Sequence, residues 1–289
     1  MMSARRIFLG ILVLLCLADV LIAQSSLSPV EALRVLTPQN ERFQFIASAD
    51  GPDAMRFNPA SVASSRGINF HYNAFLDHGK ILEHDLSLQN FLFNVAYRRS
   101  LDRSTDYHLN EYTVTLGFGV PEATFGASIN WLRSDLPHGS NGSILNLGVL
   151  LRPLDRLSIA AVKGNINQPE IGGAKLVGAN IVGVDVRPLT ETDRLILAVD
   201  ASLPNGGRVK DDVTYKLGAN VLIVEGLRVY GVYNMLPGRA TDMFSLGLQF
   251  YIPNVDFSYD AGFDHDKEYQ NGVAGVTLST ERKKTIFNP

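Results

Sequence analysis

The stretch Val255–Phe263, with the sequence VDFSYDAGF, alternates strictly between two kinds of residue. Its odd-numbered positions carry apolar side chains, whereas its even-numbered positions carry aspartate, serine and glycine. Because successive side chains of a β-strand point to opposite faces of a sheet, this period of two predicts a strand. One face of that strand is apolar, and the other is polar or very small.

The same alternation recurs along most of the chain. Phe244–Phe250, Tyr112–Phe118 and Phe125–Trp131 repeat it closely. We count about 14 such runs, and they occupy residues 67–75, 81–89, 91–99, 109–119, 123–133, 143–152, 156–165, 175–187, 193–202, 212–223, 226–235, 242–252, 255–263 and 270–281. The sequence therefore predicts an all-β protein.

The connections between these runs alternate in length. Short ones include Gln89-Asn90 and Pro253-Asn254, and long polar ones include Ser134–Gly142 and Leu203–Asp211. An even number of strands, with short turns at one end and long loops at the other, is typical of an outer-membrane barrel. In a bilayer the sheet must close, because an open edge would leave backbone groups unpaired. We therefore predict a transmembrane antiparallel β-barrel of about 14 strands.

Alternation alone does not separate such a barrel from a soluble β-sandwich, in which the polar face would point outward. Aromatic residues near predicted strand ends, such as Trp131 and Phe118, favour the membrane barrel. The first residues favour it too. Arg5-Arg6 precede the apolar run Ile7–Ala18, which is shorter than the roughly 20 residues of a spanning helix.

The start of the chain is thus predicted to be a secretory signal peptide, residues 1–23, cut after Ala23. An uncleaved anchor is the alternative. The remaining predicted parts are an N-terminal helical hatch or plug at 24–66, the barrel at 67–281 and a periplasmic tail at 282–289. The predicted location is the cell outer membrane.

Composition narrows the function. The net charge is −3, whereas nucleic-acid-binding proteins are normally basic, so no nucleic acid partner is expected. The one cysteine, Cys16, lies in the predicted leader, which rules out an intramolecular disulfide and a cysteine-based metal site. The six histidines show no metal-binding spacing. We expect neither a metal nor another cofactor.

Charged residues occupy the polar face of several predicted strands. Such groups inside a small barrel need partners, so we expect the acidic ones to pair with Arg98, Arg194 and Lys216, although they could instead tune a pore. The predicted lumen-lining residues are Glu83, Asp85, Arg98, Asp200, Lys216, Asp256 and Asp260.

Residues 24–66 do not alternate. Ser28-Pro29-Val30-Glu31 has the form of a capping box and predicts a short helix through about Leu36. Pro52-Asp53 can begin a second short helix. That helix must break at Asn58-Pro59, because the residue before proline disfavours the helical conformation. We expect Asn58, Pro59 and Ala60 to fix this segment inside the barrel.

The lead-in Ala47–Phe57, the triplet Asn58-Pro59-Ala60 and the strand that follows resemble the FadL-like superfamily. That group includes long-chain fatty acid transporters and barrels of the PorV/PorQ type. The resemblance implies 14 strands around an N-terminal hatch that carries the Asn-Pro-Ala motif. A second resemblance comes from two repeats, Arg152-Pro153-Leu154 and Arg187-Pro188-Leu189. The hairpins that contain them look like those of the FadL-like barrel associated with signal-peptide-peptidase-like proteases.

The resemblance implies a barrel that is not an enzyme. It would pass hydrophobic small molecules, or act as a membrane-embedded partner of a secretion or processing system, in contact with outer-membrane lipid. A purely structural barrel is a further alternative. A lipid hydrolase is another, because His138-Gly139-Ser140 resembles the motif of outer membrane phospholipase A. However, the position expected to orient the histidine falls near Arg152, and Pro137 indicates a loop.

Overall fold

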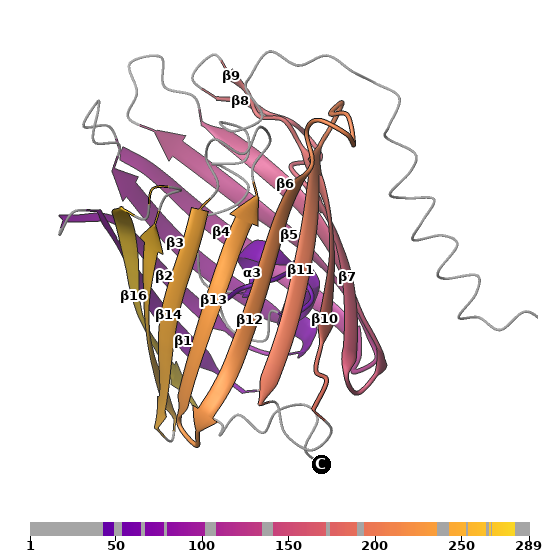
Figure 1. Ribbon diagram of the computed structural model, residues 1–289. Helices are drawn as coiled ribbons and strands as arrows, with labels where there is room; N and C mark the ends of the chain where they lie inside the picture. The colour runs from indigo at the N-terminus through magenta and orange to yellow at the C-terminus, as the bar shows by residue number, and fades with distance from the viewer. Residues whose placement is uncertain are drawn as a thin grey trace, which may run out of the picture.

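The computed structural model is a closed β-barrel with a short segment of the chain inside it (Figure 1). The described residues are 43–48, 54–64, 67–77, 80–101, 108–134, 141–171, 174–189, 194–235, 243–252, 254–263, 266 and 268–280. The predicted leader, the helix expected after Ser28, the predicted tail, His138 and Ser140 lie outside these residues. None of the helices in the described ranges has the length and apolar character needed to cross a membrane.

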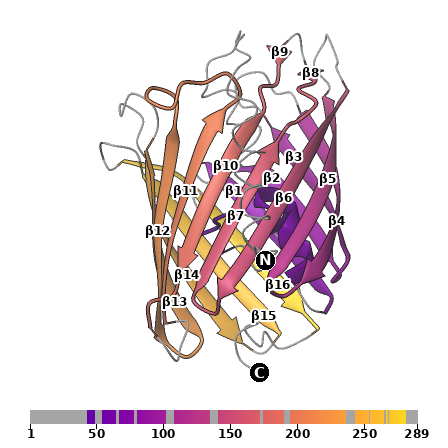
Figure 2. The ribbon, with the colours of Figure 1, turned by 90° about the vertical axis from the view of Figure 1, so that its right-hand side faces the viewer.

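Fourteen antiparallel strands form the ring, which confirms the predicted fold class and strand number. They are β1 (Asn69–Asp77), β2 (Lys80–Gln89), β3 (Phe93–Leu101), β4 (His108–Val120), β5 (Ala123–Ser134), β6 (Gly142–Leu154), β7 (Leu157–Gly164), β10 (Ala179–Val186), β11 (Leu195–Pro204), β12 (Thr214–Val224), β13 (Leu227–Met235), β14 (Met243–Ile252), β15 (Val255–Phe263) and β16 (Tyr269–Ser279). Pairing of β1 with β16 closes the ring. The pair β8 (Glu170–Ile171) and β9 (Ala174–Lys175) forms a separate small sheet at one end (Figure 2).

The polar face of the strands points into the barrel. In β4, Thr113 and Thr115 are at most 3% exposed, whereas the alternate residues Val114 and Leu116 are 37% and 59% exposed. Large apolar side chains are exposed on most of the barrel strands in the same way. Soluble proteins rarely expose continuous apolar surface of this extent. The orientation therefore excludes the β-sandwich and gives the barrel the apolar outer band of a membrane protein.

One predicted strand begins later than expected. We predicted a single strand over 175–187, but β10 begins at Ala179. The N–H of Leu176 donates to the carbonyl of Pro169 (2.9 Å), and the carbonyl of Leu176 accepts from the Asn165 side chain (2.7 Å). Because these bonds tie Leu176 to the preceding loop, its backbone does not continue the ladder with β7.

A non-strand segment lies inside the barrel ahead of β1 (Figures 1 and 2). We name it the luminal segment, with a first half at residues 43–48 and a second half at residues 54–64. The second half contains α3 (Ala54–Phe57) and the 3-10 helix η1 (Pro59–Ser64). The η1 helix packs on β4, β5 and β6, and five of its six residues are buried.

Candidate functional site

The luminal segment contacts two nearby parts of the inner wall, which β10 separates in the strand order. Ile46 and Phe57, one from each half, pack with Leu150 of β6 and Val162 of β7. Phe45 packs separately on Ala198 of β11 and Val232 of β13. The inside of the barrel thus contains apolar clusters amid the polar luminal residues. It is the candidate functional site.

Asn58 joins the two halves of this segment. Helix α3 ends at Phe57, the residue before the Asn-Pro pair, and η1 starts at Pro59. The side-chain oxygen of Asn58 accepts from the N–H of Ala60 (3.0 Å), which forms a local turn. Its side-chain nitrogen donates to the carbonyls of Ile46 (3.0 Å) and Val149 of β6 (3.2 Å). Asn58 is fully buried, so one side chain links the first half, the second half and the wall.

A row of three glycines makes room for the second half. Gly117, Gly126 and Gly148 are direct register partners on β4, β5 and β6. A Cβ atom at Gly117 would lie 2.8 Å from the backbone nitrogen of Ala63. At Gly126 it would overlap the backbone of Pro59, and at Gly148 the side chain of Asn58. The Asn-Pro-Ala backbone therefore lies directly on the wall where side chains are absent.

Buried ion pairs hold α3 against the neighbouring part of the inner wall, on β2 and β4. Arg56 contacts Asp85 of β2 (2.5 Å) and Glu111 of β4 (3.5 Å). Arg98 of β3 pairs with the same glutamate, which also accepts from Asn130 of β5. All three side chains of the Arg56 pairs are at most 6% exposed. Charged hydrogen bonds of this kind are strong, and removing one partner is costly.

The first half is held by a different pair of charges. Asp200 of β11 and Lys216 of β12 are register partners. A carboxylate oxygen of Asp200 accepts from the N–H of Ile46 (3.1 Å), and the Lys216 ammonium donates to the carbonyl of Gln44 (2.9 Å). The same ammonium lies 5.0 Å from the ring centre of Phe45. These charges therefore bind the backbone of the luminal segment as well as facing each other.

The remaining predicted lumen residues lie elsewhere on the wall. Glu83 of β2 accepts from the hydroxyl of Ser100 (2.8 Å) near the ion pairs. Asp260 of β15 is 1% exposed, and a Cβ at its register partner Gly247 would overlap it. Asp256 is partly buried on the same strand. Arg194, expected to pair inside the lumen, is exposed just before β11.

Sequence reasoning missed Glu111, Arg56 and the glycine row. Glu111 shares the polar face of β4 with Thr113. The alternation of the sequence could therefore have placed Glu111 in the lumen. Arg56 lies in a segment without periodicity, where no sequence pattern indicates which way a side chain points. The glycines were visible as small residues on the polar faces. Their alignment required the strand register, and the sequence does not contain it.

The motif at His138 and Ser140 lies outside the described residues. The position that a hydrolase would use to orient the histidine was expected near Arg152. This arginine is on β6 and only 5% exposed. The hydrolase alternative therefore remains a sequence-based hypothesis.

Comparison with known proteins places the fold among outer-membrane barrels. No protein family and no curated protein matches the sequence. The "CymD monoaromatic hydrocarbon channel" matches with a TM-score of 0.57 and 13% identity, over 82% of this chain and 95% of that one. The Pseudomonas putida toluene transporter TodX matches at 0.50 and 11%, over 83% and 98%. The Acinetobacter baumannii protein Omp33 matches at 0.52 and 9%, over 74% and 98%.

At these identities the likeness concerns the fold alone. The chain has the fold of outer-membrane β-barrels, and two of the three matched structures are hydrocarbon channels by name. By their names, the three matched proteins are a channel, an outer membrane protein and a transporter.

Proposed function

We propose that this protein is an exported outer-membrane barrel that passes hydrophobic small molecules, with the luminal segment as its hatch. One observation carries the proposal: the apolar cluster of Ile46, Phe57, Leu150 and Val162 inside a lumen lined largely by polar residues. A water-filled pore does not require apolar wall residues beneath the luminal segment. An apolar solute gains from them, because contact with an apolar wall removes its surface from water.

Displacement of the first half would uncover two apolar parts of the wall. Leu150, Ala160 and Val162 lie beneath Ile46, and Ala198 and Val232 lie beneath Phe45. These residues come from β6, β7, β11 and β13. The uncovered surface would suit an uncharged hydrocarbon better than a sugar or an ion. The names of the CymD and TodX matches agree with this substrate class.

Uptake by whole cells tests the proposal. Cells that produce the full chain are compared with cells that carry an empty vector, using labelled toluene and labelled maltose in parallel. We expect toluene to enter faster with the protein present and maltose to enter at the same rate. The variant Leu150→Asn should lower toluene uptake, whereas Asn141→Ser, at an exposed position, should not.

Equal acceleration of toluene and maltose would instead indicate an ordinary water-filled porin. No acceleration of either solute would favour the partner role, of the PorV/PorQ type, in a secretion or processing system. The burial of luminal side chains such as Gln89 and Asn94, both 0% exposed, is the observation that favours this second function. Loss of lipid hydrolysis in both His138→Ala and Ser140→Ala would support the hydrolase alternative.

A further inference from the structure

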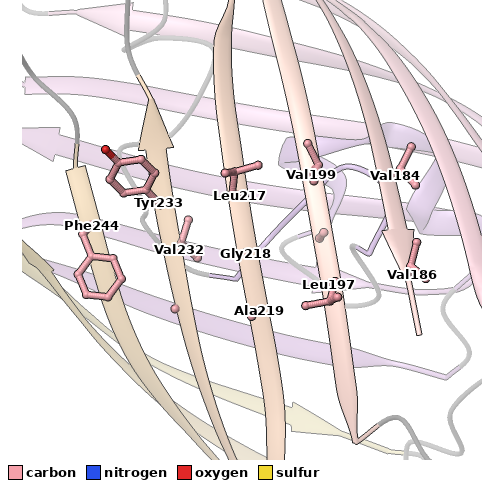
Figure 3. Close-up of a pocket in the computed structure, with 12 residues that line it drawn as sticks. Val184, Val186, Leu197, Val199, Leu217, Gly218, Ala219, Val232, Tyr233 and Phe244 are labelled. Carbon is pink, nitrogen blue, oxygen red and sulfur yellow. The ribbon is translucent and has the colours of Figure 1, made fainter. Parts of the chain in front are cut away.

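The outer wall of the barrel carries an apolar groove over β10–β14 (Figure 3). Strand register aligns one row of large side chains along its rim: Val184, Val199, Leu217, Tyr233 and Phe244. In the next row toward the short turns, Ala219 lies opposite Gly231. The row after that is again large, with Val221 opposite Val229. These two small residues leave room between the rows of larger side chains.

The fold does not require a glycine at position 231. A Cβ atom there would find its nearest neighbour at 3.7 Å, an ordinary contact distance, and Gly231 is not among the described glycines with positive φ. The luminal glycines differ, because a Cβ at Gly117 or Gly126 would overlap the luminal segment. A larger residue at Gly231 would fit the backbone and fill the groove. The packing inside the barrel therefore does not explain the glycine at position 231, which affects only the shape of the outer surface.

The position of the groove identifies the kind of molecule that fills it. It opens on the apolar outer band, between exposed residues such as Val199 and Phe244, and no charged residue lines it. Twelve residues line it, whereas a standard protein interface uses roughly 20–30 residues on each side. It crosses five strands, which at a spacing of about 4.8 Å gives a length of roughly 19 Å. A long, narrow and uncharged groove of this kind suits one extended hydrocarbon chain.

We propose that this groove binds one acyl chain of a membrane phospholipid. The bound chain lies directly outside the wall on which the first luminal half docks. Ala198, Gly218 and Val232 line the groove from the backbone side, and the ring of Phe45 packs on the same three residues from inside. The bound chain and the ring of Phe45 would thus lie on the two faces of the same part of the wall. The inference requires the barrel to lie in a membrane and does not depend on solute transport.

Native mass spectrometry of the full chain purified in detergent micelles tests this binding. The probe is 1-palmitoyl-2-oleoyl-phosphatidylethanolamine, titrated into the micelles. We expect one lipid molecule retained per wild-type barrel. The double variant Ala219→Leu/Gly231→Leu, which fills the groove, should retain at least about tenfold less lipid at the same concentration. The matched control Ala127→Leu adds a leucine at an outward-facing site on β5, away from the groove, and should retain lipid like the wild type.

Phosphatidylglycerol with the same chains is titrated in parallel, and equal retention is expected because the groove has no charged atom. Resistance of the unheated barrel to denaturation in gels shows that each variant is folded. Two results would overturn the proposal: no lipid retained by the wild type, or full retention by the folded double variant. Retention of only one headgroup would assign the site to the headgroup and would also overturn it.

Discussion

The two halves of the luminal segment are attached to the wall in different ways. The second half is held by shape, since its backbone occupies the space over Gly117, Gly126 and Gly148, and by the buried pairs of Arg56. The first half is held by single polar contacts from Asp200 and Lys216 and by the packing of Phe45. Shape fit resists any displacement, whereas single contacts break one at a time. We therefore expect the second half to be the fixed part and the first half the part that moves.

The largest expected effect on this comparison comes from Arg56→Ala. The substitution leaves Asp85 and Glu111 with less positive charge nearby in a buried place, so the free energy of unfolding should fall by about 3–5 kcal/mol. Urea unfolding in micelles measures it. Arg133→Ala, at an exposed arginine on β5, serves as the control and should change the same quantity by less than about 1 kcal/mol. Similar losses in both variants would contradict the fixed role of the second half.

Asn58→Leu should uncouple the halves from each other. It removes the bonds to the carbonyls of Ile46 and Val149 and to the N–H of Ala60. Buried groups left unsatisfied cost about 1–3 kcal/mol each, so we expect a loss near 3 kcal/mol. Single-channel recordings in planar bilayers should also show larger or noisier conductance. Asn141→Leu, at an exposed position, should leave the recordings unchanged, and quiet wild-type-like traces from Asn58→Leu would argue against the coupling.

Gly126→Ala tests the fit by shape. Its added methyl group would overlap the backbone of Pro59, and overpacking of this kind costs about 1–3 kcal/mol. Gly231→Ala is the matched control, because the nearest atom to its added Cβ is 3.7 Å away. The free energy of unfolding, measured in urea, should change by less than about 0.5 kcal/mol in this control. If both substitutions lower the free energy of unfolding equally, close packing of the luminal segment on the glycine row is contradicted.

The smallest expected effect on stability comes from Lys216→Met. It removes the bond to the carbonyl of Gln44, at a cost of about 1 kcal/mol, and the ring contacts with Phe45 and Phe57. Asp200, which faces Lys216, keeps its bond from the N–H of Ile46. The change should show more clearly in thiol labelling. In the Lys216→Met background, a cysteine at Phe45→Cys should react faster than in the wild-type background, whereas one at Met55→Cys, which packs with Val62 and Ala96 away from Lys216, should not. Lys80→Met, at an exposed lysine, is the control, and equal acceleration at both cysteines would contradict the comparison.

The luminal charges show how far the sequence leads. Parity placed Asp85, Arg98, Asp200 and Asp260 on the polar faces of their strands, and all four are buried in the structure. Parity did not tell which charges meet. Arg98 pairs with Glu111, which the sequence analysis had not selected, while Arg194 is exposed. Which charges pair depends on the register between neighbouring strands. It also depends on Arg56, which belongs to a segment without a periodic pattern.

The sequence by itself determined the strands, their number and which of their residues share a face, because a period of two is a local property of the extended backbone. The break before Pro59 was determined locally too, by the restriction that proline places on the preceding residue. Only the tertiary structure decided that the polar faces point inward and that β16 returns to β1. It also aligned Gly117, Gly126 and Gly148 beneath the Asn-Pro-Ala turn. These features depend on register and closure, which arise only when all fourteen strands pair at once.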